Sequence, residues 1–146
     1  MKIFTANQIR AWDQFTIMEE PVSAVNLMER AAAACFKWIK KNIPLSKKII
    51  ICCGTGNNGG DGLAIARLLH KSKYRVAIYI LDNKKRSEGF TVNLDRLLAV
   101  KMELFFVQTT TDFPSIVKNT VIIDALYGTG IGRPLKNIAA QLVNHI

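Results

Sequence analysis

Hydrophobic and polar positions follow two different patterns along this chain, and the change comes near Lys48. Before it, apolar residues recur every three or four positions, as they do on one face of an amphipathic helix. A first helix is expected after Thr5, which can form a capping box with Gln8. A second is expected from Ser23 to about Lys41. Its apolar stripe comprises Leu27, Met28, Ala31, Cys35 and Ile39.

After residue 48, short apolar runs that suit strands buried on both faces alternate with stretches of helical periodicity. The pattern predicts strands at 49–53, 75–81, 103–107 and 120–125, and helices at 61–71, 91–100, 113–118 and 135–146. This alternation favours an α/β fold with a doubly wound, mostly parallel sheet, in three αβα layers, Rossmann-like and preceded by the two N-terminal helices. Because a crossover helix normally leads into another parallel strand, a sheet truncated at its C-terminus is expected.

Composition is that of one folded domain. Apolar residues make up 49% of the 146 positions, which allows a sizeable core. No apolar run approaches the roughly 20 residues of a transmembrane helix, and no signal peptide is evident. We therefore expect a soluble, cytoplasmic protein without a membrane partner. Cys35, Cys52 and Cys53 have neither metal-site spacing nor a disulfide framework, and are expected to be buried and reduced.

The net charge of +9 is compatible with a nucleic-acid surface or with attraction for small anions. The positive residues gather at 37–48, around a helix end, and at 84–86, in a loop without interleaved aromatic residues. A nucleic-acid partner is therefore the less favoured interpretation. The small residues Ala31–Ala34 allow another helix to approach closely, either from the same chain or from a second subunit in a homodimer formed through the N-terminal helices.

Eight of the nine glycines fall in two clusters, Gly54–Gly62 after the first predicted strand and Gly128–Gly132 after the fourth. Glycine permits positive φ and lets a ligand approach the bare backbone. A strand followed by a glycine loop and a helix N-terminus forms an anion-binding nest. In the common strand order 3-2-1-4, the first and fourth strands are neighbours. Both loops are therefore expected to border one ligand-binding crevice.

The first loop satisfies the pattern G-x-G-x-x-G, and Asp82 stands about where a ribose-binding acid would follow. This supports a generic dinucleotide-binding dehydrogenase module. Asp61, however, places a negative charge in the phosphate cradle, and the amides of Asn57 and Asn58 suit a monovalent cation or a polar ligand. Turn chemistry explains the two asparagines equally well, and Asp61 is also compatible with a first-turn helix acid.

Asp124 ends the fourth predicted strand, where a carboxylate would face the crevice. Partial desolvation there would raise its pKa and suit general acid–base work, whereas capping of local N–H groups is the less favoured alternative. Thr129 and Arg133 suit phosphate contacts, or else a turn hydroxyl and a surface cation. His70 and His145 have no ligand-spaced partner and are expected to be structural.

Two segments resemble the signatures of the YjeF N-terminal domain family: Gly54-Thr-Gly-Asn-Asn-Gly-Gly-Asp-Gly62 with the helix to Leu69, and Asp124-Ala-Leu-Tyr-Gly-Thr-Gly-Ile-Gly-Arg-Pro134. The opening residues 1–6 and 27–32 resemble its N-terminal helices. The resemblance covers 1–146 as a single domain and implies NAD(P)HX epimerase activity, an isomerase reaction that interconverts the R and S epimers of hydrated NADH and NADPH for repair by a separate dehydratase.

The resemblance also assigns roles to residues. It implies that the hydrated nucleotide is bound by Asn57, Asn58, Gly59, Gly60, Asp61, Gly128, Thr129, Gly130, Ile131, Gly132, Arg133 and Pro134. It further implies that Asn58 and Asp124 bind a potassium ion, with Asp124 also the candidate catalytic acid–base. The family continues into another strand and an Asp-x-Pro-Ser-Gly-like segment that this sequence lacks, so weak binding or no turnover by the chain is expected. The rival hypothesis is a non-catalytic scaffold of this fold that binds protein or RNA.

Overall fold

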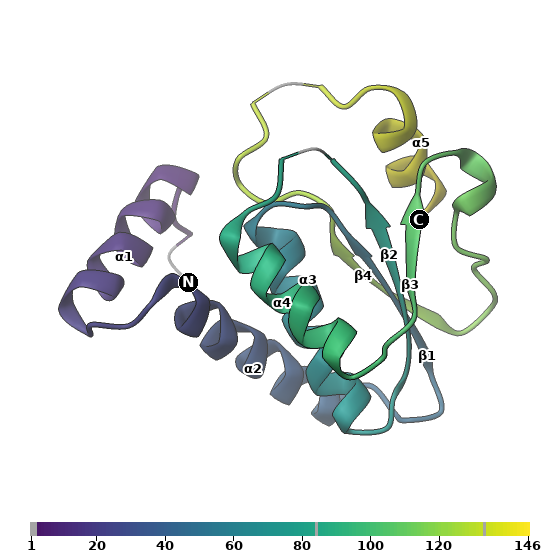
Figure 1. Ribbon diagram of the computed structural model, residues 1–146, viewed down its shortest axis with the longest axis horizontal. Helices are drawn as coiled ribbons and strands as arrows, with labels where there is room; N and C mark the ends of the chain where they lie inside the picture. The colour runs from purple at the N-terminus through teal and green to yellow at the C-terminus, as the bar shows by residue number, and fades with distance from the viewer. Residues whose placement is uncertain (1–2, 84, 133) are drawn as a thin grey trace.

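A computed structural model describes residues 3–83, 85–132 and 134–146 of the chain. Five helices, four strands and a 3₁₀ turn follow one another in these residues (Figure 1). In chain order they are α1 (Ala6–Glu19), α2 (Ala24–Asn42), β1 (Lys48–Cys53), α3 (Asn57–Lys71), β2 (Arg75–Leu81), α4 (Glu88–Ala99), β3 (Leu104–Val107), η1 (Thr110–Asp112), β4 (Thr120–Ala125) and α5 (Asn137–His145). None of the helices in the described residues has the length and apolarity needed to cross a lipid bilayer.

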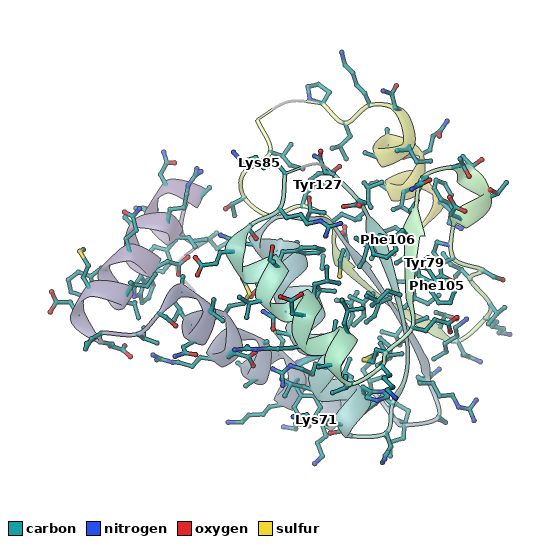
Figure 2. The ribbon with its side chains drawn as sticks, in the orientation of Figure 1. Lys71, Tyr79, Lys85, Phe105, Phe106 and Tyr127 are labelled. Atoms are coloured by element: carbon teal, nitrogen blue, oxygen red, sulfur yellow. The ribbon has the colours of Figure 1, made fainter. Side chains whose placement is uncertain are left out.

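The four strands form a parallel sheet in the order β3-β2-β1-β4, which confirms the predicted order. The central strand β1 pairs on both sides, so that Cys52 lies opposite Tyr79 in β2 and opposite Asp124 in β4. At the β2–β3 side, the rings of Tyr79 and Phe105 stack with their centroids 5.0 Å apart (Figure 2). The carboxyl ends of β1 and β4, where the two glycine clusters begin, are therefore adjacent.

Alternate residues of the strands face two separate apolar clusters. Ile49, Ile51 and Cys53 pack with α2, α3 and α4, whereas Ile50 and Cys52 pack with α5. Residues 49–53 are all fully buried, as expected for a central parallel strand. Burying one isoleucine side chain contributes roughly 1.5–3 kcal/mol, so the three isoleucines of β1 stabilise the sheet. The expectation that all cysteines are buried is wrong for Cys35, which is exposed on α2.

The N-terminal helices begin where the caps predict, but they pack differently from the predicted stripes. The Thr5–Gln8 capping box is present, and Ser23 caps α2. The buried positions of α2 are Met28, Ala32 and Ile39, so the predicted stripe is confirmed at Met28 and Ile39 and wrong at Ala31 and Cys35, which are exposed. The reason is that α2 packs against both α3 and α4. No described residue of α1 is buried, and α1 stands apart from the layered core (Figure 1).

Three helix predictions are corrected by local capping and packing. Helix α3 begins at Asn57 instead of residue 61, and α4 begins at Glu88 because Ser87 accepts the N–H of Phe90. The predicted helix at 113–118 is wrong: η1 precedes that segment, and 113–118 is irregular. The segment is held instead by α5, since His145 Nε2 lies 2.9 Å from the carbonyl oxygen of Pro114.

Candidate functional site

The two glycine loops touch each other through their backbones. Gly54 N–H donates to the carbonyl oxygen of Ala125 at 3.0 Å. A Cβ built on Gly54 would lie 2.1 Å from the carbonyl oxygen of Leu126. None of the nine glycines adopts the positive φ that glycine permits. Glycine is needed at Gly54 because two backbones approach too closely for any side chain.

Helix α3 starts inside the first glycine loop, with Gly56 at its N-cap. The first helical hydrogen bond runs from Gly60 N–H to Gly56 C=O at 3.0 Å, which leaves the N–H groups of residues 57–59 without a helical acceptor. Unpaired N–H groups at the positive end of a helix dipole are the donors that anion sites use. Asn57 and Asn58 therefore lie in the first helical turn and not at a loop tip.

Asn58 connects the two loops. A Cβ built on Gly128 would lie 3.3 Å from Asn58 Cβ and 3.9 Å from its Oδ1 atom. The side chain of Asn58, in the first glycine loop, thus lies against the backbone of the second loop at Gly128. The prediction that the two loops lie side by side, at the carboxyl ends of neighbouring strands, is confirmed. The ligand-binding crevice between them stays a prediction.

Asp61 follows Asn58 by three residues and so projects from the same side of α3. It is half-buried, and burial followed by the negative charge of Asp13 raises the pKa of Asp61 to about 6. No described residue forms a hydrogen bond with its carboxyl group that would counter this shift. Helix α3 therefore carries, three residues after Asn58, a carboxyl group that keeps a proton to an unusually high pH.

Asp124, the last residue but one of β4, is exposed, so the expected desolvation of this side chain is wrong. The physical reason is that β4 lies at the edge of the sheet. Its Oδ1 atom accepts the N–H of Leu126 at 2.9 Å, which is the local capping that the sequence made the less favoured interpretation. Its other oxygen accepts no hydrogen bond from the described residues and remains open to a ligand.

The rest of the second loop lies open. Residues 128–132 and Pro134 are exposed, and a Cβ built on Gly130 or Gly132 would meet nothing within 4 Å. Arg133, a predicted phosphate contact, lies outside the described residues. The loop therefore offers accessible backbone at the mouth of the crevice.

Comparison with known proteins assigns the family. Residues 24–146 match the sequence profile of the YjeF-related protein N-terminus. The chain belongs to this family.

Several curated members of the YjeF-related family are similar over almost all of the chain. It is 35% identical over 146 residues to an NAD(P)H-hydrate epimerase of Limosilactobacillus reuteri, covering 99% of the chain and 67% of the relative. It is 38% identical over 143 residues to the enzyme of the same name from Limosilactobacillus fermentum, covering 97% and 66%. The chain thus spans about two thirds of the length of these relatives.

Two further comparisons extend to a larger protein and to a solved structure. The chain is 31% identical over 134 residues to the bifunctional NAD(P)H-hydrate repair enzyme Nnr of Coxiella burnetii, covering 92% of the chain and 27% of that protein. The crystal structure of yeast ynu0 superposes with a TM-score of 0.84 at 21% identity, covering 99% of the chain and 64% of the yeast chain. The yeast structure confirms the predicted α/β fold.

Several residues near the crevice have no signal in the sequence. Thr55 is buried, its hydroxyl donates to Lys85 C=O at 2.8 Å, and its carbonyl oxygen accepts Ser87 N–H at 2.9 Å. Asp13 acts on Asp61 from α1. Both relationships join segments far apart in the sequence, and only the folded chain places them together. Figure 2 shows Lys85 at the same end of the molecule as Tyr127, which follows β4.

Proposed function

We propose that this chain interconverts the R and S epimers of hydrated NADH and hydrated NADPH. The observation that carries the proposal is the contact between Asn58 and Gly128, which joins the two motifs in one crevice. The name of the two Limosilactobacillus relatives, NAD(P)H-hydrate epimerase, specifies the reaction.

The start of α3 is the proposed phosphate site. The N–H groups of residues 57–59 and the helix dipole attract a nucleotide phosphate. The hydrated nicotinamide ring then lies between Asn58 and the second glycine loop, where the exposed residues 128–132 and Pro134 supply further contacts. Asn57–Asp61 and Gly128–Pro134 together form the proposed nucleotide site.

The reaction inverts a carbon that carries both a hydroxyl group and the ring nitrogen. Either the C–O bond or the C–N bond breaks and re-forms, and each route moves a proton on and off oxygen. The free carboxylate oxygen of Asp124 is our candidate for taking this proton. Asp61, whose pKa is raised to about 6, is protonated in part of the molecules near neutral pH and is placed to donate. Two carboxyl groups in different surroundings suit the two roles.

The same crevice fits a potassium ion by its donor atoms. The amide oxygen of Asn58 and the carboxylate oxygen of Asp124 are hard ligands of the kind that hard cations prefer. Asn58 Oδ1 lies beside the bare backbone at Gly128, where no side chain fills the space. When bound, the ion would supply positive charge beside the two carboxyl groups and the nucleotide phosphates.

Cation binding has a readout that does not depend on activity. We expect KCl to raise the thermal midpoint of the chain relative to tetramethylammonium chloride of equal concentration, since binding to the folded state stabilises it. The increase should be lost in Asn58→Ala. Equal midpoints in the two salts for the unsubstituted chain would contradict the potassium assignment.

The activity is tested with NADHX enriched in one epimer, followed against a protein-free control. In contrast to the weak or absent turnover expected from the sequence, the proposal requires the chain to accelerate epimerisation. Asp124→Ala is then expected to lower kcat/KM by about 10²–10⁴-fold, the usual effect of losing an acid–base group. Asp95→Asn, an exposed acid on α4, is the matched control and should retain the activity. A folded chain that is no faster than the protein-free control would overturn the proposal.

We further propose that α1 mediates a homodimer. Trp12, Phe15 and Met18 are 57%, 58% and 72% exposed on a helix that buries nothing in its own chain. Large apolar side chains that gather on an exposed surface are typical of interaction sites. Sedimentation should give a dimer for the chain and a monomer for the Trp12→Ser/Phe15→Ser variant, whereas a monomeric unsubstituted chain would contradict this assignment.

A further inference from the structure

A second hollow lies at the carboxyl end of the sheet, away from the two glycine loops. An open pocket of ≈ 410 Å³ is lined by Asp82, Asn83, Arg86, Val107, Gln108 and Ile138. These residues follow or end β2 and β3, or belong to α5 and the β2–α4 connection. Its size is in the range of small-molecule sites, which is 300–1,000 Å³.

The polar wall of this pocket is an organised ion pair. Arg86 Nη2 donates to both carboxylate oxygens of Asp82, at 3.0 and 2.9 Å. The guanidinium carbon also lies 5.8 Å from the centroid of the buried Phe90 ring. About a third of each charged side chain is exposed, 37% for Arg86 and 35% for Asp82. Both groups are therefore held in position and still reachable by a ligand.

The remaining lining suits a nucleoside. Val107 and Ile138 provide an apolar surface for the flat face of a base, and Asn83 and Gln108 provide amides for hydroxyl groups. In open α/β sheets an acid at the end of the second strand binds a ribose 2′-hydroxyl, whereas an arginine nearby accommodates a 2′-phosphate. Here the acid and the arginine are both present, and they form an ion pair with each other.

The pocket and the crevice belong to one edge of the sheet. Strands lie about 4.8 Å apart, so the β2–β3 pocket is about 10 Å from the region between the two glycine loops. The pyrophosphate and the adjoining ribose of a dinucleotide together bridge such a span. The segment that carries Arg86 is tied to the first glycine loop on both sides, through Thr55 with Lys85 and Thr55 with Ser87. A ligand with its phosphates at the start of α3 can thus reach Asp82.

We infer that this pocket binds the adenosine ribose of the nucleotide and that the Asp82–Arg86 pair selects the ribose diol over its 2′-phosphate. The inference rests on the proposed function for the identity of the substrate. A diol donates to Asp82 without separating the pair. A 2′-phosphate must displace Asp82 from Arg86 and then lies beside an unpaired carboxylate.

Calorimetric titration with AMP and with adenosine 2′,5′-bisphosphate tests the pocket without any turnover. We expect the chain to bind AMP about tenfold more tightly than the bisphosphate, the factor that corresponds to one hydrogen bond to a charged group. Asp82→Ala should reverse the order, because it frees Arg86 for the 2′-phosphate. Arg86→Ala should weaken the bisphosphate further while AMP binding is retained. Asp95→Ala, on the outer part of α4, is the control and should change neither affinity.

The outcomes separate this inference from the proposed function. Equal affinities for the two ligands, or a preference that Asp82→Ala and Arg86→Ala leave unchanged, would overturn the inference even if the chain epimerises NADHX. The KM ratio for NADHX and NADPHX should change in the same direction as the two affinities. A chain that shows the AMP preference and its reversal but does not accelerate epimerisation would retain the inference and lose the proposed function.

Discussion

Asp61 on α3 lies within electrostatic range of Asp13 on α1, although 48 positions separate them in the sequence. Burial is the larger cause and Asp13 the second cause of a pKa near 6 for the Asp61 carboxyl group. Helix α1, which buries no residue of its own, thus contributes a charge to the crevice.

Asp61→Asn should change stability in a pH-dependent way. The folded chain keeps the proton on Asp61 up to a pH of about 6, whereas the unfolded chain releases it near 3.8. The wild-type free energy of unfolding therefore falls as pH rises between these values and levels off above them. After allowance for solvent screening, the variant should be more stable than wild type by roughly 1–3 kcal/mol at pH 8 and equal to it below pH 4. Guanidinium unfolding at a series of pH values measures the difference.

Two companion variants sharpen the Asp61 test. Asp13→Asn should reproduce the effect in part, because the burial of Asp61 is unchanged. Asp95→Asn should show no comparable pH dependence. A difference between wild type and Asp61→Asn that stays constant from pH 4 to pH 8 would show that Asp61 titrates normally.

Gly59→Ala should strongly destabilise the chain although alanine favours helix. A Cβ at this position would lie 1.8 Å from the carbonyl oxygen of Gly54, and a backbone atom in a closed turn cannot move aside. We expect a loss of about 3 kcal/mol, at the upper end of overpacking effects. Gly130→Ala, where a Cβ meets nothing within 4 Å, is the matched control and should remain within about 0.5 kcal/mol. Similar unfolding midpoints for the two variants would rule out the close contact.

Much of the architecture could be predicted because it depends on local patterns. The continuous apolar run at 49–53 identified the central strand, and the strand order brought the two glycine clusters together. Caps at Thr5 and Ser23 placed the first two helices. Each of these features is decided by neighbouring residues or by a general rule of sheet topology.

The errors arise where tertiary packing overrides a local pattern. The start of α3 was placed too late because glycine is a poor helix former, yet close packing on Gly54 selects it at Gly59. The exposure of Asp124 depends on β4 being an edge strand, which no feature of residues 120–125 reveals. The roles of Asp124 in proton transfer and in potassium binding stay predictions.

Glu29 joins three helices, and Glu29→Gln should weaken their packing. Its carboxylate accepts from Arg67 on α3 at 2.6 and 2.5 Å and from Arg96 on α4 at 2.5 Å. The Arg67 side chain is only 13% exposed, so it would retain a poorly solvated charge. We expect a loss of about 2 kcal/mol in the free energy of unfolding.

The matched control for Glu29 is Glu20→Gln. Glu20 pairs with Arg30 at the surface, where both side chains are more than half exposed, so the loss should be under about 1 kcal/mol. Equal losses for the two variants would mean that the three-helix contact contributes no more than a surface pair.

Native thiol titration should detect one cysteine of three. Cys35 is exposed, whereas burial and then the charge of Asp124 raise the pKa of Cys52 to about 12, and burial raises that of Cys53 well above its usual range. Because the thiolate is the reactive form, an aromatic disulfide reagent should modify Cys35 rapidly and the other two only in denaturant. Rapid modification of two or three thiols in the native protein would contradict the burial of β1.

Because Cys52 and Cys53 are adjacent in the central strand, their modification would also report opening of the sheet. If Cys35 is blocked first, any later reaction with the reagent would come only from molecules in which the sheet has opened. Cys52 and Cys53 would then be labelled from opposite faces of the sheet. The rate of that uptake would give the opening kinetics of the strand that leads into the first glycine loop, with no substitution introduced.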